Sequence, residues 1–556
     1  MFYAFYKVVN HFWYYMIRFF FILFCIFSLT GCYISKQKKE LYKNHKIEMA
    51  DPLISKYLIA NYSISKGDYH TASEVLNSDF ENHKLIKLKF YSNLVVGNFI
   101  EANRVSNLIV TEKKENFLYS LPQYILDIKN RNFKETLENY ESNTMFADLK
   151  SLNTLINSWF QNKNNITDNN IHSNFQNTSL HELLILENSQ NNKNLKEIAD
   201  FIYKNEELNH NDYLFLAGFY FRLNDFKKFN EIIETKLTNQ FDKKLIIKNF
   251  HRKNDIFSKK PQLNVILSSK LYNDAIANDS KGEKSQDLRK ILLEMSVFIC
   301  PEMDISKYSL AEIYSLEKNN DIALKKLDTI KNDSFFFLAS NLKKLSIYKS
   351  LKLDENYKVL LFENMNIHPD NEYLLYEVAN YYKLNKQYKK SLRTYEKIIN
   401  NFGENNRLNF LYASNLDKVG EWDKAKNLFF DILNDNPNDT YTLNYISYKL
   451  SLRNEDLDVA KDLIERAISI DPENGYFLDT KGWVEYKRKN FKNAVFYIEK
   501  AVSILPNSAE ILDHLGDCYL KLNRKKEAVY EWKRALKYEK DEIVLKKINQ
   551  KIRENE

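Results

Sequence analysis

The chain has 556 residues, of which 44% are hydrophobic and 28% charged, with 81 Lys and Arg against 74 Asp and Glu. The net charge of +7 is small against so many charged side chains, so we predict a mixed, solvated surface and no nucleic-acid partner. Only 8 Pro and 10 Gly are present, which leaves few turns beyond the connections between helices. A chain of this length usually forms several domains, but a repeat array is an exception because each repeat packs only on its neighbours.

The N-terminal segment is predicted to be a targeting signal. Residues 1–31 carry only Lys7 and Arg18 as charged side chains, and residues 19–29 form an uninterrupted apolar run. That length suits the core of a signal peptide and is short for a membrane-spanning helix, which needs about 20 residues. The run ends in Leu29-Thr30-Gly31-Cys32, which resembles the bacterial lipobox.

The lipobox resemblance implies that the Cys32 thiol receives a diacylglyceryl group and that the signal peptidase cuts between Gly31 and Cys32. We therefore expect a signal peptide at 1–31 and a polar, Lys-rich tether at 32–50. Tyr33 replaces the Asp that retains some lipoproteins in the inner membrane, which favours the outer membrane, with the chain facing the periplasm. An uncleaved anchor helix is the alternative, because residues 12–17 are also apolar, and Met16 is a second candidate start.

Residues 51–330 have a helical pattern that repeats only loosely. Gly67 and Ala72 fit one helix-turn-helix unit, and Gly97 and Ala102 fit a second, shortened one. We expect loops in the Asn-rich insert near 161–177 and at 281–286, because both have little apolar content. Further candidate turns lie at 132–133 and 224–226, and residues 331–370 are predicted to form a degenerate unit in phase with the later repeats.

Residues 371–540 repeat at a near-fixed period. Gly482 and Gly516 are 34 positions apart, as are Ala494 and Ala528, and Ala460 precedes Ala494 by the same interval. Within one unit, small and apolar residues recur at helical spacing on two segments joined by a short turn. The small residues are predicted to lie where two antiparallel helices approach closely, and residues 541–556 are predicted to form a capping helix, because a terminal repeat exposes an apolar face.

This pattern resembles the tetratricopeptide repeat (TPR), a 34-residue helix-turn-helix unit. Five copies are in register over about 372–540, and the best-matched residues are Ala413, Gly420, Trp422, Ala425, Phe429 and Pro437; Gly482, Phe491, Ala494, Ala501 and Pro506; and Gly516, Tyr519, Ala528 and Ala535. The chain also resembles large bacterial TPR lipoproteins. We therefore predict an all-α, superhelical solenoid of TPR and degenerate TPR-like repeats.

The resemblance implies a non-catalytic scaffold or adaptor that binds a protein or peptide partner along the concave surface, which the first helix of each TPR unit lines. Taking Ala379, Ala413, Tyr448, Gly482 and Gly516 as the eighth position of each unit, the fifth, ninth and twelfth positions should face this groove. These are Tyr376, Asn380 and Lys383; Phe410, Ser414 and Asp417; Tyr445, Lys449 and Leu452; Asp479, Trp483 and Tyr486; and Asp513, Asp517 and Leu520. For Trp483 and Tyr445, packing between neighbouring repeats is the open alternative.

The sequence shows no pattern of an enzyme, and we expect no cofactor and no small-molecule substrate. His181-Glu182 begins like a zinc-protease helix but lacks a second His at the fourth position after the first. His514, Asp517 and Cys518 could share a helix face, but they fall inside a repeat pattern that explains them without a metal. Cys300 and Cys518 are expected to be buried free thiols, and a disulfide between them stays open. An enzyme with an unrecognised site in the N-terminal half is the alternative function.

Overall fold

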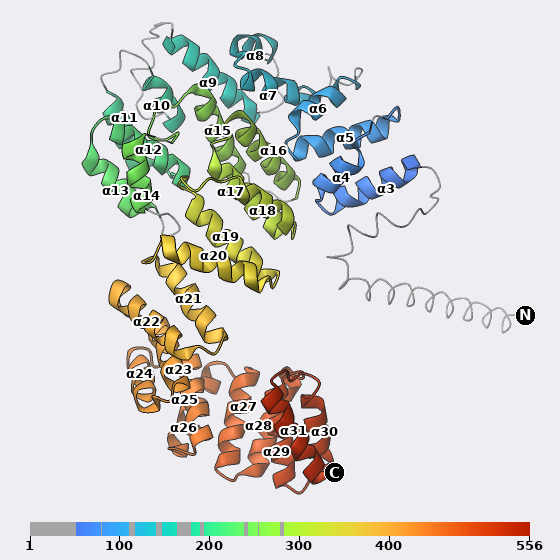
Figure 1. Ribbon diagram of the computed structural model, residues 1–556, viewed down its shortest axis with the longest axis vertical. Coiled ribbons are helices and arrows are strands. Elements are labelled where there is room, and N and C mark those ends of the chain that lie inside the picture. The colour runs from blue at the N-terminus through green and yellow to red at the C-terminus, as the bar shows by residue number, and fades with distance from the viewer. Residues whose placement is uncertain are drawn as a thin grey trace, which may run out of the picture. The chain divides into compact units, whose positions relative to one another are not determined.

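The computed structural model describes residues 52–78, 80–109, 117–140, 147–163, 179–188, 194–237, 243–253, 255–277 and 283–556. The predicted signal peptide, Cys32 and the tether lie outside the described residues. The chain divides into two compact units, Met1–Glu207 with Lys260–Lys326, and Leu208–Lys259 with Leu327–Glu556. Figure 1 shows that the described elements are helices, which confirms the predicted all-α fold class.

The first unit consists of short helices, most of them in antiparallel pairs. They are α3 (Pro52–Ser65), α4 (Tyr69–Val75), α5 (His83–Val95), α6 (Phe99–Ser106), the 3-10 turn η1 (Phe117–Tyr119), α7 (Leu121–Lys129), α8 (Phe133–Tyr140), α9 (Ala147–Lys163), α10 (Leu180–Leu186), α11 (Leu195–Asn205), α15 (Leu263–Ala277), α16 (Glu283–Ile299), α17 (Asp304–Leu316) and α18 (Asn320–Asp328).

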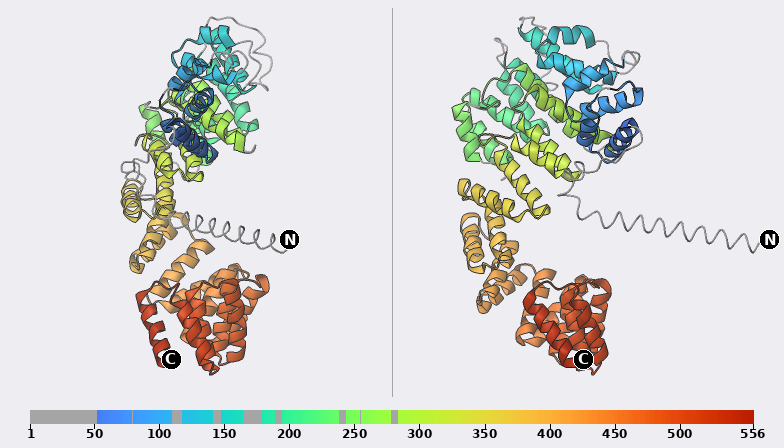
Figure 2. Two further views of the ribbon diagram at one scale, coloured as in Figure 1. Left: turned by 90° about the vertical axis from the view of Figure 1, so that its right-hand side faces the viewer. Right: turned by 45° about the vertical axis from the view of Figure 1, so that its right-hand side comes forward.

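The second unit contains a separate three-helix group and the long repeat array. The group is α12 (His210–Arg222), α13 (Phe226–Lys236) and α14 (Lys243–Arg252). The array is α19 (Phe337–Ser350), α20 (Asp354–Ile367), α21 (Glu372–Leu384), α22 (Tyr388–Phe402), α23 (Asn406–Lys418), α24 (Trp422–Asp435), α25 (Thr440–Arg453), α26 (Leu457–Ile470), α27 (Gly475–Lys487), α28 (Phe491–Ile504), α29 (Ala509–Lys521), α30 (Lys525–Ala535) and α31 (Glu542–Asn555). Figure 2 shows its C-terminal helices, in red, stacked side by side.

In the turn between the two helices of a repeat, one residue has a left-handed backbone conformation. Its positive φ ends the first helix, because an α-helix requires a negative φ. From the first unit into the second, this residue recurs every 34 or 35 positions, at Lys318, Lys352, Lys386, Gly420, Asn454, Lys489 and Asn523. The regular phase therefore starts at the α17–α18 pair and includes α19–α20, the predicted degenerate unit. Gly97 and Arg131 show the same interval, so the phase recurs locally in the first unit.

Small residues allow the helices of a pair to approach closely, as the repeat pattern predicted. A Cβ atom added to Gly482 would lie 2.3 Å from Cγ1 of Ile498 and 3.0 Å from the carbonyl oxygen of Ala494, so α27 and α28 touch at this point. Ala494 and Ala501 on α28 are completely buried. The contact between α27 and α28 is therefore built around positions where only small residues fit.

Two predicted loops are partly helical. Residues 161–163 of the predicted Asn-rich insert form the last residues of α9, and residues 283–286 of the second predicted loop begin α16. In both cases the helix continues into the predicted loop, because the neighbouring turns hold the backbone in place. Residues 164–178 of the insert lie outside the described residues.

The first unit departs from a simple linear array, because α16 packs back on α5 and α7. Phe298 of α16 meets the ring of Phe99 edge-on at 5.2 Å, and Glu294 lies against Gly97 in the α5–α6 turn. In the second unit, the rings of Phe250 and Phe257 pack on Phe335, just before α19. These contacts join segments that are far apart in sequence, which neighbour-only packing does not predict.

Candidate partner-binding surface

The N-caps of the first helices fix the register of the repeat. Asn371, Asn405, Asp439 and Asn474 each accept a backbone N–H bond at the start of their helix. Counting eight residues on from each N-cap reaches Ala379, Ala413, Ser447 and Gly482, all of them buried small residues. The same count from Ser508 reaches Gly516.

The predicted register of the third unit is therefore wrong by one residue. Ser447, not Tyr448, is the eighth position, and its hydroxyl donates to the carbonyl oxygen of Ala460 at 2.7 Å. The extra residue of this unit lies after α25, where Asn454 and Asp456 both have positive φ. The fifth, ninth and twelfth positions become Asn444, Tyr448 and Ser451, in place of Tyr445, Lys449 and Leu452.

Of the residues predicted to face the groove, four are buried: Ser414, Asp417, Asp479 and Trp483, each 5–7% exposed. Leu452 is exposed, and the rest are half-buried, namely Tyr376, Asn380, Lys383, Phe410, Tyr445, Lys449, Tyr486, Asp513, Asp517 and Leu520. In the C-terminal part of the array the first helices also pack on one another, since α25 contacts α27 and α27 contacts α29.

An aromatic stack occupies the surface of α27 and α29. The ring of Trp483 lies parallel to that of Tyr486, with centroids 4.7 Å apart, and stacks on His514 at 4.0 Å. The His514 Nδ1 atom lies 3.0 and 3.2 Å from the two carboxylate oxygens of Asp479. The hydroxyl of Tyr448 donates to Glu510 at 2.5 Å, which links α25 to α29.

Charged groups beside this stack change the pKa of His514. Burial lowers the pKa of His514, but the Asp479 carboxylate, through attraction and a hydrogen bond, and the nearby Glu510 and Asp513 raise it above the usual 6.5. Asp479 and His514 occupy adjacent positions in successive units. An alignment of the repeats with one another would have placed these two residues at neighbouring positions and so indicated that they could meet.

Internal ion pairs hold the remaining acidic groups of the surface. Asp417 accepts from Lys449 and Tyr445 at 2.9 Å and from Arg453 at 2.5 Å. Burial alone would raise the pKa of Asp417, but these partners hold it below its usual value. Lys551 of the capping helix α31 lies 2.7–3.0 Å from the carboxylate oxygens of Asp513 and Asp517.

Helix α21 leaves two polar side chains available. Asn380 and Lys383 of α21 are half-buried and make no hydrogen bond or ion pair among the described residues. Burial, and then the charge of Lys418 on α23, lower the pKa of Lys383. Tyr376 shares a face of the same helix with them, and its ring meets that of Tyr395 edge-on, with the centroids 6.5 Å apart. This surface, made of Tyr376, Asn380 and Lys383, is called the α21 surface below.

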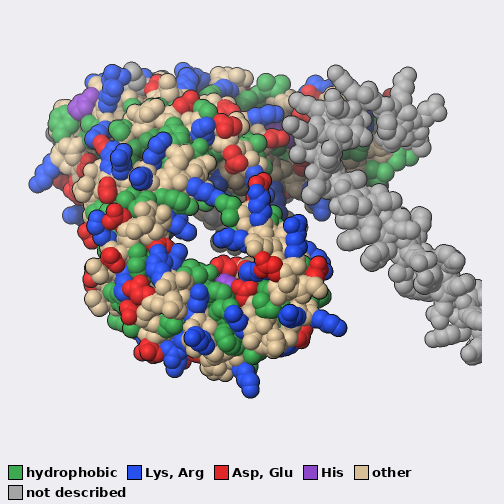
Figure 3. Space-filling view, turned by 60° about the horizontal axis from the view of Figure 1, so that its bottom comes forward, with side chains coloured by type: hydrophobic (Ala, Val, Ile, Leu, Met, Phe, Trp, Pro, Cys, Tyr) green, Lys and Arg blue, Asp and Glu red, His purple; other side chains and the backbone are tan. Residues whose placement is uncertain are grey.

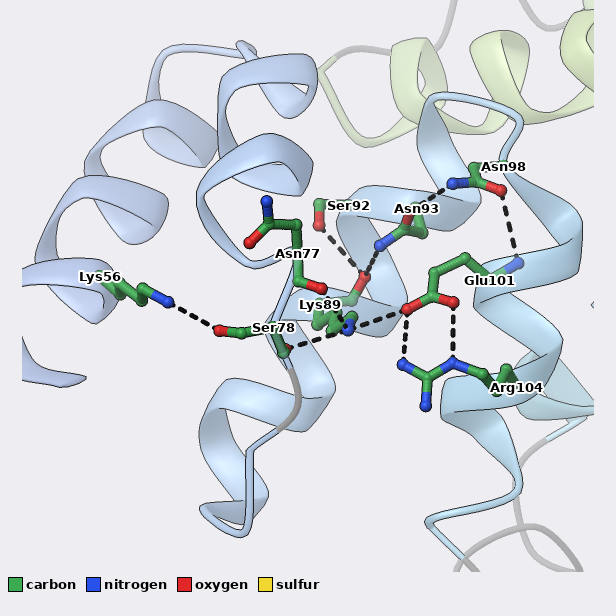
Figure 4. A network of polar contacts seen from close by, with 9 residues as sticks. All are labelled: Lys56, Asn77, Ser78, Lys89, Ser92, Asn93, Asn98, Glu101 and Arg104. Atoms are coloured by element: carbon green, nitrogen blue, oxygen red, sulfur yellow. Dashed lines mark hydrogen bonds and ion pairs between the residues drawn. The ribbon is translucent and has the colours of Figure 1, made fainter. Parts of the chain in front are cut away.

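Groups that an enzyme in the N-terminal half could use have structural partners instead. His181 is buried, its Nε2 atom lies 3.2 Å from the Ser269 hydroxyl, and burial lowers its pKa to about 3. Figure 4 shows Lys89, buried between α5 and α6, with its ammonium group 3.0 Å from the Ser78 carbonyl oxygen and 2.8 Å from Glu101. Lys290 is paired in the same way with Glu317 at 2.8 Å.

Neither cysteine has the character of a nucleophile. Cys300 and Cys518 are buried and form no disulfide with each other, as expected. Burial raises the pKa of the Cys300 thiol to about 12 and raises that of Cys518 as well.

Among the described residues, no three His, Cys, Asp or Glu side chains converge on a metal-binding geometry, and the helices are all too short or too polar to cross a bilayer. Figure 3 shows charges of both signs interspersed on the face in view.

The sequence matches no family model and no curated protein. Solved structures that are similar include a thermophilic TPR protein, TTC0263, from Thermus thermophilus, with 16% identity and a TM-score of 0.30 over 33% of this chain and 98% of that chain. A TPR protein from Parabacteroides merdae has 14% identity and a TM-score of 0.31 over 39% and 98%. Yeast Tom70 has 12% identity and a TM-score of 0.32 over 90% and 95%.

The spacing of turns and N-caps, at 34 positions with one extra residue after α25, decides the type of repeat. The chain folds as a TPR-type solenoid. In the C-terminal repeats of this TPR solenoid, the side chains of the first helices bond to one another. The α21 surface is the part of the predicted groove that keeps unpaired polar groups.

Proposed function

We propose that this TPR solenoid is a non-catalytic scaffold, anchored in a bacterial envelope membrane through lipid on Cys32, that binds an extended segment of a protein partner at the α21 surface. The observation that carries the proposal is the pair Asn380 and Lys383. Both side chains are half-buried, both lack a partner within the described chain, and both share a face of α21 with Tyr376.

Unpaired polar groups on a partly dehydrated surface favour binding, because a partner can satisfy them at little cost in desolvation. Tyr376 adds an aromatic side chain of the kind that often carries binding energy at interfaces. The acidic residues of the later units are held by Lys449, Lys551 and His514, so they offer less to a partner. The proposed site is therefore shorter than the groove predicted from the sequence.

The lipid anchor and the location at the outer membrane, facing the periplasm, rest on the lipobox resemblance and Tyr33. They place the proposed scaffold at a surface where its partner would be an envelope protein. An uncleaved anchor helix remains the competing arrangement, and the partner-binding surface is independent of which one holds.

Replacing both Asn380 and Lys383 with Ala tests the proposal. Neither side chain has an internal partner, so stability should change by no more than about 0.5 kcal/mol, while partner recovery from solubilised envelopes should fall several-fold. The matched control is Asn400→Ala with Lys389→Ala, two exposed and unpaired residues of α22. Equal partner recovery with the two double variants would contradict the proposed site.

A further inference from the structure

The outer face of the first described helix carries an exposed apolar stripe. Ile54, Leu58 and Tyr62 of α3 follow one another at every fourth position and are 54%, 59% and 66% exposed. Leu53 beside them is 43% exposed. The opposite face, with Ala60 and Ser63, is buried against α4 and α5. The helix thus has a packed side and an apolar side whose residues are 43–66% exposed.

The charged side chains of α3 itself have one sign. Helix α3 contains no Asp or Glu, and Lys66 lies over the ring of Tyr62 at 5.8 Å. The adjoining segment 33–50 holds five lysines against two glutamates. The apolar side chains of this stripe are followed by Tyr62 and Lys66. This order suits a bilayer interface, where apolar side chains meet acyl chains, Tyr lies among the headgroups and Lys meets anionic phosphates.

The length of chain between the lipid and the helix favours the same occupant. Cys32 and Pro52 are 20 positions apart in sequence, so a flexible connection would have a root-mean-square length of roughly 25 Å. A weak contact held at that distance works at an effective concentration on the order of millimolar. A few apolar side chains are then enough for frequent contact, because the acyl chains already supply the main affinity.

We propose that the Leu53, Ile54, Leu58 and Tyr62 face of α3 docks on the phospholipid surface as a second, non-covalent contact beside the lipid anchor. The inference rests on the proposed anchoring at Cys32. Docking would hold the first helix pair flat on the bilayer and limit the orientations that the tether allows. The alternative occupants are the chain's own segment 33–50 and a second copy of the protein.

The test places an environment-sensitive nitrobenzoxadiazole label at Leu58→Cys, with Ile543→Cys on α31, 65% exposed, as the matched control. Cys32 is left out of the labelled protein, and the two remaining thiols of the mature chain, Cys300 and Cys518, are buried and do not compete for the label. The mature chain, with a hexahistidine tag in place of the lipid, is bound to phosphatidylethanolamine and phosphatidylglycerol vesicles that contain nickel-chelating lipid. This tether is independent of lipidation, so failure of the natural lipid anchor in a separate flotation experiment does not affect the result.

We expect the label at position 58 to shift its emission to the blue on vesicles and to be quenched by spin-labelled lipid, and the label at 543 to do neither. Adding Ile54→Ser and Tyr62→Ser should abolish the shift. A water-like emission at 58 on vesicles would overturn the inference. Emission that is already blue-shifted without vesicles would also overturn it, and would assign the stripe to segment 33–50 or to a second copy.

Discussion

At the residue scale, the indole of Trp483 lies within the aromatic stack of α27 and α29 and is only 7% exposed. Of the two interpretations that the sequence left open for Trp483, the structure favours packing between neighbouring repeats. We predict that Trp483→Ala costs about 3–5 kcal/mol, because it leaves a cavity between Tyr486 and His514. Trp483→Phe should cost less, since a ring remains. Hydrogen exchange across α27–α29 measures the loss, and unchanged protection in Trp483→Ala would contradict the stack.

The Asp479–His514 pair predicts a pH dependence of stability. The folded pKa of His514 is raised above 6.5, so protonated His514 stabilises the fold. That contribution is fully present below about pH 6.5 and is lost as the pH rises through the folded pKa. We predict that the melting temperature decreases as the pH increases through the folded pKa of His514, and that the decrease is smaller in Asp479→Asn. An equally steep fall in Asp479→Asn would show that other groups cause it.

The sequence predicted single residues well where a repeat fixes them. Ala494 and Gly482 lie in the close approach that their size implied. Asp479 and His514 were placed in different candidate sites, because one sequence read alone does not show which side chain of the next repeat each will meet. Tyr448 was misplaced by one position, because the 35-residue step from Ala425 to Ala460 was applied to the first helix as well, although the added residue lies after that helix, at 454–456.

At the element scale, α31 closes the array through Lys551. Burial lowers the pKa of Lys551, but Asp517 and Asp513 raise it, so the ammonium form is held between the two carboxylates. We predict that Lys551→Met destabilises the last repeat by about 1–3 kcal/mol, between the values for exposed and buried ion pairs. Lys547→Met, on an exposed and unpaired residue of the same helix, is the control. Faster hydrogen exchange confined to α29–α31 is expected in Lys551→Met alone, and equal exchange in the two variants would refute the role of Lys551.

Helix pairs were predicted more reliably than their packing partners. The turns at Gly67, Gly97 and Asn224 are where the sequence placed them, because a turn is set by a few adjacent residues. The return of α16 to α5 and α7 was not predicted. It depends on side chains such as Phe99 and Phe298, which are far apart in sequence and carry no periodic signal.

At the scale of the whole molecule, attachment to the membrane depends on a residue outside the described structure. We predict that Cys32→Ser abolishes incorporation of a palmitate analogue, because the thiol is the atom that the lipobox resemblance assigns to lipid. Cys300→Ser is the control, since that thiol is buried and should take no lipid. Equal labelling of wild type and Cys32→Ser would contradict the anchor and favour an uncleaved N-terminal helix.

The central claim is that a partner binds at the α21 surface, and site-specific photo-crosslinking in living cells tests it most directly. A benzophenone amino acid is introduced at Asn380 and, as a control, at Tyr530, which is 63% exposed on α30. The account predicts a discrete crosslinked protein at Asn380 that is absent at Tyr530 and is lost when Lys383→Ala is added. The same crosslinks from both positions, or none from Asn380 while the protein is folded and membrane-bound, would contradict it.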